Sequence, residues 1–136
     1  MSEALQTAQI TLGAVETILK AGFIRVEPSD GGYLVVEEDR TRAAVSLSLE
    51  KSMVTYQSLW SISEAFSTEE KRKAVDELNR QYILVRFSLP GPSTLRCDYQ
   101  FLYEDGVTGH FFVNTLRHFL IVAGHAVRSL PEEMLA

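Results

Sequence analysis

Three histidines near the C-terminus are the first residues whose type and spacing could support chemistry. His110, His118 and His125 lie in a segment of helical periodicity, and at about 100° per residue they fall within an arc of roughly 80°. A rise of about 1.5 Å per residue separates neighbouring members by roughly 10–12 Å along the helix axis, whereas ligands of one metal converge within a few ångströms. We therefore expect neither a metal site nor a catalytic site from these histidines.

The same arc of the last helix also holds Asn114, Arg117 and Arg128. This composition predicts a solvent-facing basic edge, because a surface helix keeps one face in water. A partner-binding surface is the functional interpretation of this edge. Its candidate residues are His110, Arg117, His118, His125 and Arg128.

The chain has one tryptophan and one cysteine, and both are expected to pack in the core. Trp60 shares one side of a predicted strand with Tyr56, and an exposed anchor for a protein partner is the alternative role for Trp60. Cys97 shares a strand side with Tyr99, where a thiol behaves as a small hydrophobic group. A reactive cysteine needs an exposed, electropositive setting, so we expect no nucleophile at Cys97.

No other motif indicates catalysis or a cofactor. None of the serines lies in a Gly-x-Ser-x-Gly pattern, and Gly31-Gly32 lacks the lysine-bearing signature of a phosphate loop. Glu37-Glu38-Asp39 reads as a solvated turn, since consecutive strand residues point to alternate faces. Lys71-Arg72-Lys73 has acidic residues on both sides, which predicts intrahelical ion pairs and not a nucleic-acid site. We expect no catalytic residue, no cofactor and no metal.

The elements that position these residues follow from hydrophobic periodicity. Helices are predicted over residues 5–20, 67–80 and 108–127. Strands are predicted over residues 24–27, 33–37, 45–49, 54–62, 83–89 and 95–103. Gly22 ends the first helix, Ser67 and Glu70 form a capping box at the second, and Thr108 caps the third. In the predicted strand over residues 83–89, Ile83 is expected on the apolar side.

The order of these elements, α-β-β-β-β-α-β-β-α, defines the expected fold class. Short hairpin connections make neighbouring strands antiparallel, and the helices must cover one face of the sheet. We therefore predict an α+β fold, an antiparallel β-sheet with helices packed on one face. No linker or repeat divides the chain, so residues 1–136 are expected to form a single domain.

Composition narrows the classes of partner and the compartment. The 136 residues are 46% hydrophobic and 23% charged, typical of one globular domain. The net charge of -5 argues against nucleic acid. One cysteine excludes an internal disulfide and fits a reducing compartment. Without a signal peptide or a membrane-spanning stretch, we expect a cytoplasmic protein with no membrane contact.

Several segments carry a resemblance to a known family. Residues 74–79, the Arg86-Phe87 pair, residues 95–99 and residues 105–108 together resemble the YbjN family, small bacterial proteins often labelled sensory transduction regulators. The resemblance is strongest over residues 68–125. It implies a fold similar to the type III secretion chaperones, a twisted antiparallel sheet with flanking helices, and frequent homodimers. Asn79, one of the specific motif residues, is expected to cap its helix by bonding to local backbone.

These observations favour a non-enzymatic protein-interaction domain that acts as a bacterial regulator or chaperone-like adaptor. A protein or peptide partner is expected, with recognition through apolar anchors or a sheet edge. A homodimer is expected because helices on only one face leave the other sheet face to be covered. The alternative is a small-ligand sensor or unrecognised enzyme with a pocket between the sheet and the C-terminal helix. That pocket would be lined by Trp60, Tyr99 and Tyr103.

Overall fold

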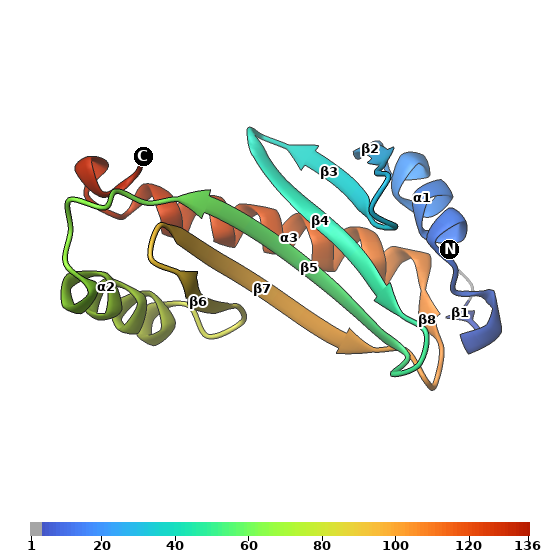
Figure 1. Cartoon of the computed structure of the whole chain (residues 1–136). Helices are drawn as coiled ribbons and strands as arrows, with labels where there is room; N and C mark the ends of the chain where they lie inside the picture. Colours follow the sequence, from blue (N-terminus) through green and yellow to red (C-terminus); the bar gives the residue numbers. More distant parts are fainter. Residues whose placement is uncertain (1–3) are drawn as a thin grey trace.

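The computed structural model describes residues 4–136 and has the predicted α+β architecture (Figure 1). Within these residues, six strands form one antiparallel sheet in the order β2-β3-β4-β5-β7-β6. The strands are β2 (Arg25–Pro28), β3 (Leu34–Glu38), β4 (Thr41–Ser48), β5 (Met53–Ser61), β6 (Arg86–Gly91) and β7 (Thr94–Leu102). The α-helices are α1 (Leu12–Ala21), α2 (Thr68–Gln81) and α3 (Gly109–Arg128). The predicted order of helices and strands is confirmed.

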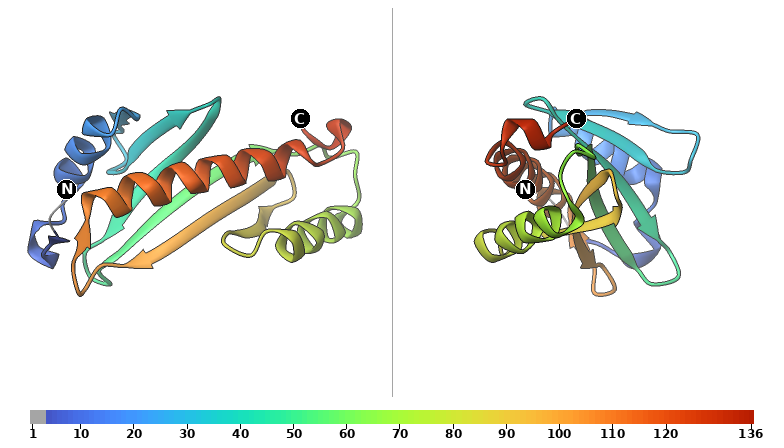
Figure 2. Two further views of the ribbon diagram at one scale, coloured as in Figure 1. Left: turned by 180° about the vertical axis from the view of Figure 1, so that it is seen from behind. Right: turned by 60° about the vertical axis from the view of Figure 1, so that its left-hand side comes forward.

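Helix α3 lies across one face of the sheet, and the other two helices lie at its two edges (Figure 2). Helix α1 packs against β2 and α3, and α2 packs against β6. Figure 1 looks onto the opposite face, over which the described chain places no helix. One face of the sheet is therefore covered and the other is open, as expected for a two-layer fold.

Alternating strand residues and the apolar stripe of α3 form the core between sheet and helix. Val54 and Tyr56 of β5 and Leu95 and Cys97 of β7 are each at most 2% exposed. Side chains at i and i+2 of a strand share a face, so these residues all point toward α3. The predicted stripe of α3 is buried at Phe112, Leu116, Phe119, Leu120, Ala123 and Val127.

Two of the predicted helix starts are confirmed by their side-chain caps. The Glu70 N–H donates to Ser67 Oγ at 3.1 Å, and the Ser67 N–H donates to Glu70 Oε1 at 2.9 Å. This exchange satisfies two amides that have no partner inside the helix, and the bond from the Ser67 N–H lowers the pKa of Glu70 because it favours the charged carboxylate. At α3, the Phe111 N–H donates to Thr108 Oγ1 at 3.0 Å.

The prediction of a helix beginning at residue 5 is wrong. Ala4–Leu5 form strand β1, which pairs antiparallel with β8 (Val107–Thr108) in a small second sheet, and Thr7–Gln9 form a 3₁₀ turn. Helix α1 starts seven residues later, where Thr11 Oγ1 accepts from the Ala14 N–H at 3.1 Å. Tertiary pairing with the segment before α3 overrides the local helical spacing of Leu5.

Glycine at position 22 ends α1 as predicted and also lets α1 approach α3. A Cβ added to Gly22 would lie 2.8 Å from Cγ2 of Val113, closer than side chains pack. The next residue, Phe23, takes the left-handed conformation at φ +65° and is 92% exposed. Its N–H and that of Ile24 bond back to the carbonyls of the last turn, which closes the helix end.

Strand β6 begins at Arg86, three residues later than predicted, because the register with β7 starts at the Arg86–Asp98 pair. Ile83 is 88% exposed and not on an apolar strand side. The expected helix-capping role of Asn79 is also wrong. Its side-chain amide donates to the Phe87 carbonyl at 2.9 Å and accepts from the Phe87 N–H at 2.7 Å. Asn79 thus occupies the free edge of β6 as a neighbouring strand would.

Candidate functional site

The three histidines of α3 do not converge, and each has a different environment. His110 Nε2 lies 2.7 Å from the side-chain nitrogen of Asn114, and His125 Nδ1 lies 2.9 Å from the Tyr82 hydroxyl. His118 has no hydrogen bond or ion pair to the described residues, and it lines a pocket. No group of three His, Cys, Asp or Glu within residues 4–136 could hold a metal ion.

Arg117 is an internal connection and not a member of a free basic edge, so that part of the prediction is wrong. Its Nε lies 3.1 Å from both carboxylate oxygens of Glu38, and its Nη2 donates to the Gly22 carbonyl at 2.7 Å. Both side chains are about two-thirds buried. The interpretation of Glu38 as part of a solvated turn is wrong for the same reason. The ion pair with Glu38 connects α3 to β3, and the bond to the Gly22 carbonyl connects α3 to the end of α1.

The remaining two partner-binding candidates are Arg128, three residues after His125, and Trp60. Arg128 is exposed in the last turn of α3. Trp60 is half-buried on the core side of β5, directly across from Leu95 of β7. The six candidate residues therefore do not form one continuous surface. His118 and His125 share the flank of α3 that faces the end of α2, whereas Arg117 points to β3.

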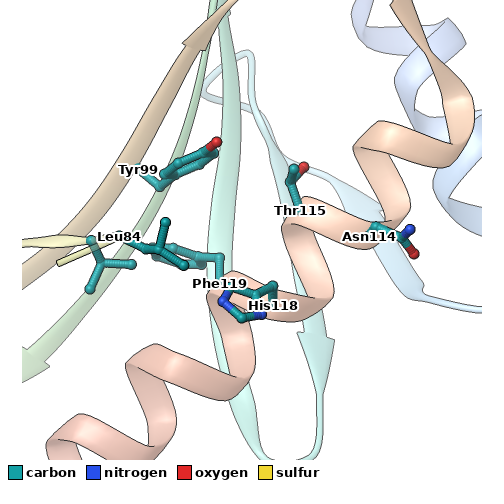
Figure 3. Close-up of a pocket in the computed structure, with 7 residues that line it drawn as sticks. Leu84, Tyr99, Asn114, Thr115, His118 and Phe119 are labelled. Atoms are coloured by element: carbon teal, nitrogen blue, oxygen red, sulfur yellow. The ribbon is translucent and has the colours of Figure 1, made fainter. Parts of the chain in front are cut away.

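A pocket of about 330 Å³ opens between the sheet, α3 and the segment that leads into β6 (Figure 3). Tyr99 of β7 and Phe119 of α3 contribute aromatic rings, and Leu84, from the segment before β6, lies beside Phe119. The lining residues are Leu84, Val85, Tyr99, Asn114, Thr115, His118 and Phe119. The polar groups thus come from α3, except the Tyr99 hydroxyl, and the aliphatic groups come from residues 84 and 85.

A buried hydrogen-bond network supports the floor of this pocket. The Tyr56 hydroxyl lies 2.8 Å from Thr115 Oγ1 and donates to the Phe112 carbonyl at 3.2 Å. Burial raises the pKa of Tyr56, so its phenol stays neutral. The Tyr56 ring centroid lies 6.0 Å from Tyr99 and 5.9 Å from Phe119. These contacts hold both pocket rings in fixed positions.

The pocket lies between the sheet and the C-terminal helix, as predicted. Only one of the three residues that were predicted to line it does so. Tyr99 lines it. Tyr103 is 1% exposed within the core, and Trp60 does not line the pocket. Both errors arise because the crossing of α3 over the sheet leaves this gap beside Tyr99, and strand alternation carries no information on that crossing.

Cys97 is buried as predicted, and its thiol is unreactive in the folded chain. The side chain is fully inaccessible to solvent, and burial together with the neighbouring Asp98 charge raises the pKa of the Cys97 thiol to about 12. The thiolate is the reactive form of cysteine. In the folded chain, a reagent therefore cannot reach the Cys97 sulfur, and the thiol remains protonated.

We expect Cys97 to react with a thiol-specific disulfide reagent at pH 8 about 1,000-fold or more slowly than a free cysteine. Raising the pKa from 9.0 to about 12 lowers the thiolate fraction by that factor before access is considered. Labelling should become fast in unfolding concentrations of urea. Rapid labelling of the native protein would contradict the buried position.

Lys71 is buried, so the prediction that its basic run is explained by ion pairs within the helix is wrong for this residue. Its side chain is 6% exposed in the first turns of α2. The ammonium group donates to the Pro92 carbonyl in the turn between β6 and β7. Lys71 therefore fastens α2 to this hairpin, and the hydrogen bond satisfies part of a charge that is costly to bury alone.

Sequence reasoning missed Leu84 and Val85 as pocket residues and missed Thr115 as a polar contact. The alternation of residues 83–89 placed Val85 in a regular strand, and nothing in that pattern indicates a turn of the chain toward α3. For Thr115, its spacing of three residues from His118 was the one available signal, because residues at i and i+3 of a helix lie on the same face.

Comparisons with solved structures match this arrangement of helices and strands. YbjN from E. coli, a proposed transcription regulator, superposes with a TM-score of 0.74 at 11% sequence identity, over 87% of this chain and 89% of that one. The chain shares the YbjN fold. A chain of the ExsC-ExsE complex superposes with a TM-score of 0.50 at 16% identity, over 85% of this chain and 90% of that one.

These two likenesses confirm the expected chaperone-like fold, and at such identities they concern the fold alone. Neither a scan against protein-family models nor a search of curated proteins finds a match. None of the helices among residues 4–136 combines the length and the apolar character that crossing a membrane requires.

Proposed function

We propose that the protein is a non-enzymatic, YbjN-like interaction domain that acts as a bacterial regulator or chaperone-like adaptor in the cytoplasm. The observation that carries this proposal is the fold that this chain shares with a chain of the ExsC-ExsE complex, which is an assembly of two proteins. Function resides in sites and not in folds, so the proposal also rests on the chemistry of the surface.

The distribution of reactive groups supports a binding role. The thiol is buried and protonated, the three histidines are separated along α3, and the described residues offer no metal-binding group of three. Nucleophilic or acid–base catalysis needs a nucleophile and a base together in a binding site. The Tyr82 hydroxyl and His125 Nδ1 lie 2.9 Å apart, but neither residue lines the pocket. Recognition of a protein needs neither a nucleophile nor a base.

Helix α3 is the surface that we propose for the partner. Its exposed residues include Arg128, His118 and His125, and the helix has no acidic residue, in a chain of net charge -5. Its exposed side also carries the apolar side chain of Ile121, 61% exposed, between His118 and His125. Basic and apolar groups together fit an acidic partner segment with an apolar anchor.

The test of this proposal is a crosslinking pull-down from the native cell followed by binding measurements with the purified partner. A His118→Glu, His125→Glu double variant should weaken binding at least tenfold, because it opposes the charge of an acidic segment. Lys73→Glu on exposed α2 makes a matched charge change away from α3 and should leave binding unchanged. Recovery of no partner, together with turnover of a metabolite by the purified protein, would overturn the proposal.

We expect light scattering at micromolar concentration to give twice the chain mass of 15.3 kDa, about 31 kDa. The helix-free sheet face exposes Leu59 of β5 and Leu102 of β7 by 56% and 64%, and pairing of two copies would cover such apolar groups. A Leu59→Lys, Leu102→Lys variant should shift the mass toward that of one chain. A wild-type monomer at this concentration would refute dimerisation.

A further inference from the structure

The pocket between β7 and α3 has the size and the lining of a site for a small molecule. Its volume of about 330 Å³ falls at the lower end of the range of roughly 300–1,000 Å³ found for ligand pockets. We infer that it binds a small, neutral aromatic molecule that carries one hydrogen-bonding group. This inference goes beyond the proposed role in protein binding and does not depend on it.

The walls of the pocket favour an aromatic occupant. The rings of Tyr99 and Phe119 border the cavity, with Leu84 beside Phe119 (Figure 3). Aromatic rings at centroid distances of about 4.5–7 Å attract one another beyond the effect of buried area. Tyr56 contacts both rings from behind, so they are positioned before a ligand enters. A preorganised site loses less entropy on binding.

The polar groups favour a neutral ligand with a hydroxyl or similar group. No Lys, Arg, Asp or Glu is among the residues that line the pocket, so an ionised ligand would lose water without gaining a permanent counter-charge. His118 and Asn114 lie one helical turn apart on the same wall. His110 and His125 are bonded within the protein, whereas the ring nitrogens of His118 have no hydrogen-bond partner in the described chain.

Access to the pocket is provided by the segment between α2 and β6. Leu84 is 54% exposed at the mouth, although it is an aliphatic side chain. The preceding Ile83 is 88% exposed. A ligand can therefore reach the rings without unfolding of a helix or strand, and a larger side chain at position 84 would narrow the entrance.

The test is an NMR titration of the full-length, isotope-labelled protein with four probes of similar size. They are benzyl alcohol, benzoate, benzylammonium and cyclohexylmethanol. Saturable shifts should appear at residues 84, 85, 99 and 114–119 with benzyl alcohol. Its Kd should be at least tenfold lower than those of the two ions, which find no counter-charge. The Kd of benzyl alcohol should also be about 2- to 10-fold lower than that of cyclohexylmethanol, whose ring is not aromatic.

Three variants locate the binding. His118→Ala should raise the Kd of benzyl alcohol about 3- to 10-fold through loss of one hydrogen bond. Leu84→Trp should raise it at least tenfold by narrowing the mouth, and because Leu84 is 54% exposed the larger side chain can be accommodated outside the core. Leu49→Ala, exposed in the turn between β4 and β5 and outside the pocket, should leave the Kd unchanged. Equal affinity for all four probes, or binding unaffected by both His118→Ala and Leu84→Trp, would overturn the inference.

Discussion

Replacing Phe112 with alanine should lower the free energy of unfolding by about 3–5 kcal/mol. Phe112 is completely buried at the start of α3, and its ring packs edge-on against Phe101 of β7 at a centroid distance of 5.5 Å. The substitution leaves a cavity that the surrounding sheet cannot close, so lost contacts add to the lost transfer energy. Urea unfolding followed by circular dichroism measures the change.

Phe111 provides the matched control for this experiment. It is the preceding residue on the same helix turn, its ring also packs edge-on against Phe101, and it is 39% exposed. Phe111→Ala should cost about 1–2 kcal/mol, because part of its surface already faces water. Equal losses at both positions would mean that α3 is rotated relative to the orientation described above.

Asn79→Ala should lower the free energy of unfolding by about 1–3 kcal/mol, although alanine is the better helix former. The Asn79 side chain makes two hydrogen bonds to the backbone of Phe87. Its removal leaves the N–H and carbonyl of an edge strand without their partner. An unprotected edge can pair with another chain, so the variant should also aggregate more readily on heating.

Two further variants separate the edge contact from other effects. Asn79→Asp keeps an acceptor for the Phe87 N–H but has no donor for its carbonyl, so an intermediate loss is expected. Arg80→Ala removes the next side chain of α2, whose bond is to Glu77 on the surface, and should cost less than about 0.5 kcal/mol. A neutral Asn79→Ala variant would show that the edge of β6 does not need this partner.

The sequence by itself determined the elements whose signals are local. The alternation over residues 95–103 predicted β7, and the Ser67 to Glu70 spacing predicted the start of α2, because strand period and helix capping depend on neighbours a few residues away. The burial of Cys97 followed from the same alternation. The stripe of α3 likewise followed from its own spacing, so this part of the core could be predicted from the sequence.

Only the tertiary structure decided which of these elements meet. Strand β5 pairs with β7 and not with β6, the next strand along the chain, and this order places Tyr99 under α3. Glu38 and Arg117 are 79 residues apart and form an ion pair. The sequence predicts ion pairs within the helix for Lys71, but its side chain is buried and donates to the Pro92 carbonyl. Such contacts depend on strand order and helix crossing, which arise from the packing of the whole core and leave no mark in local periodicity.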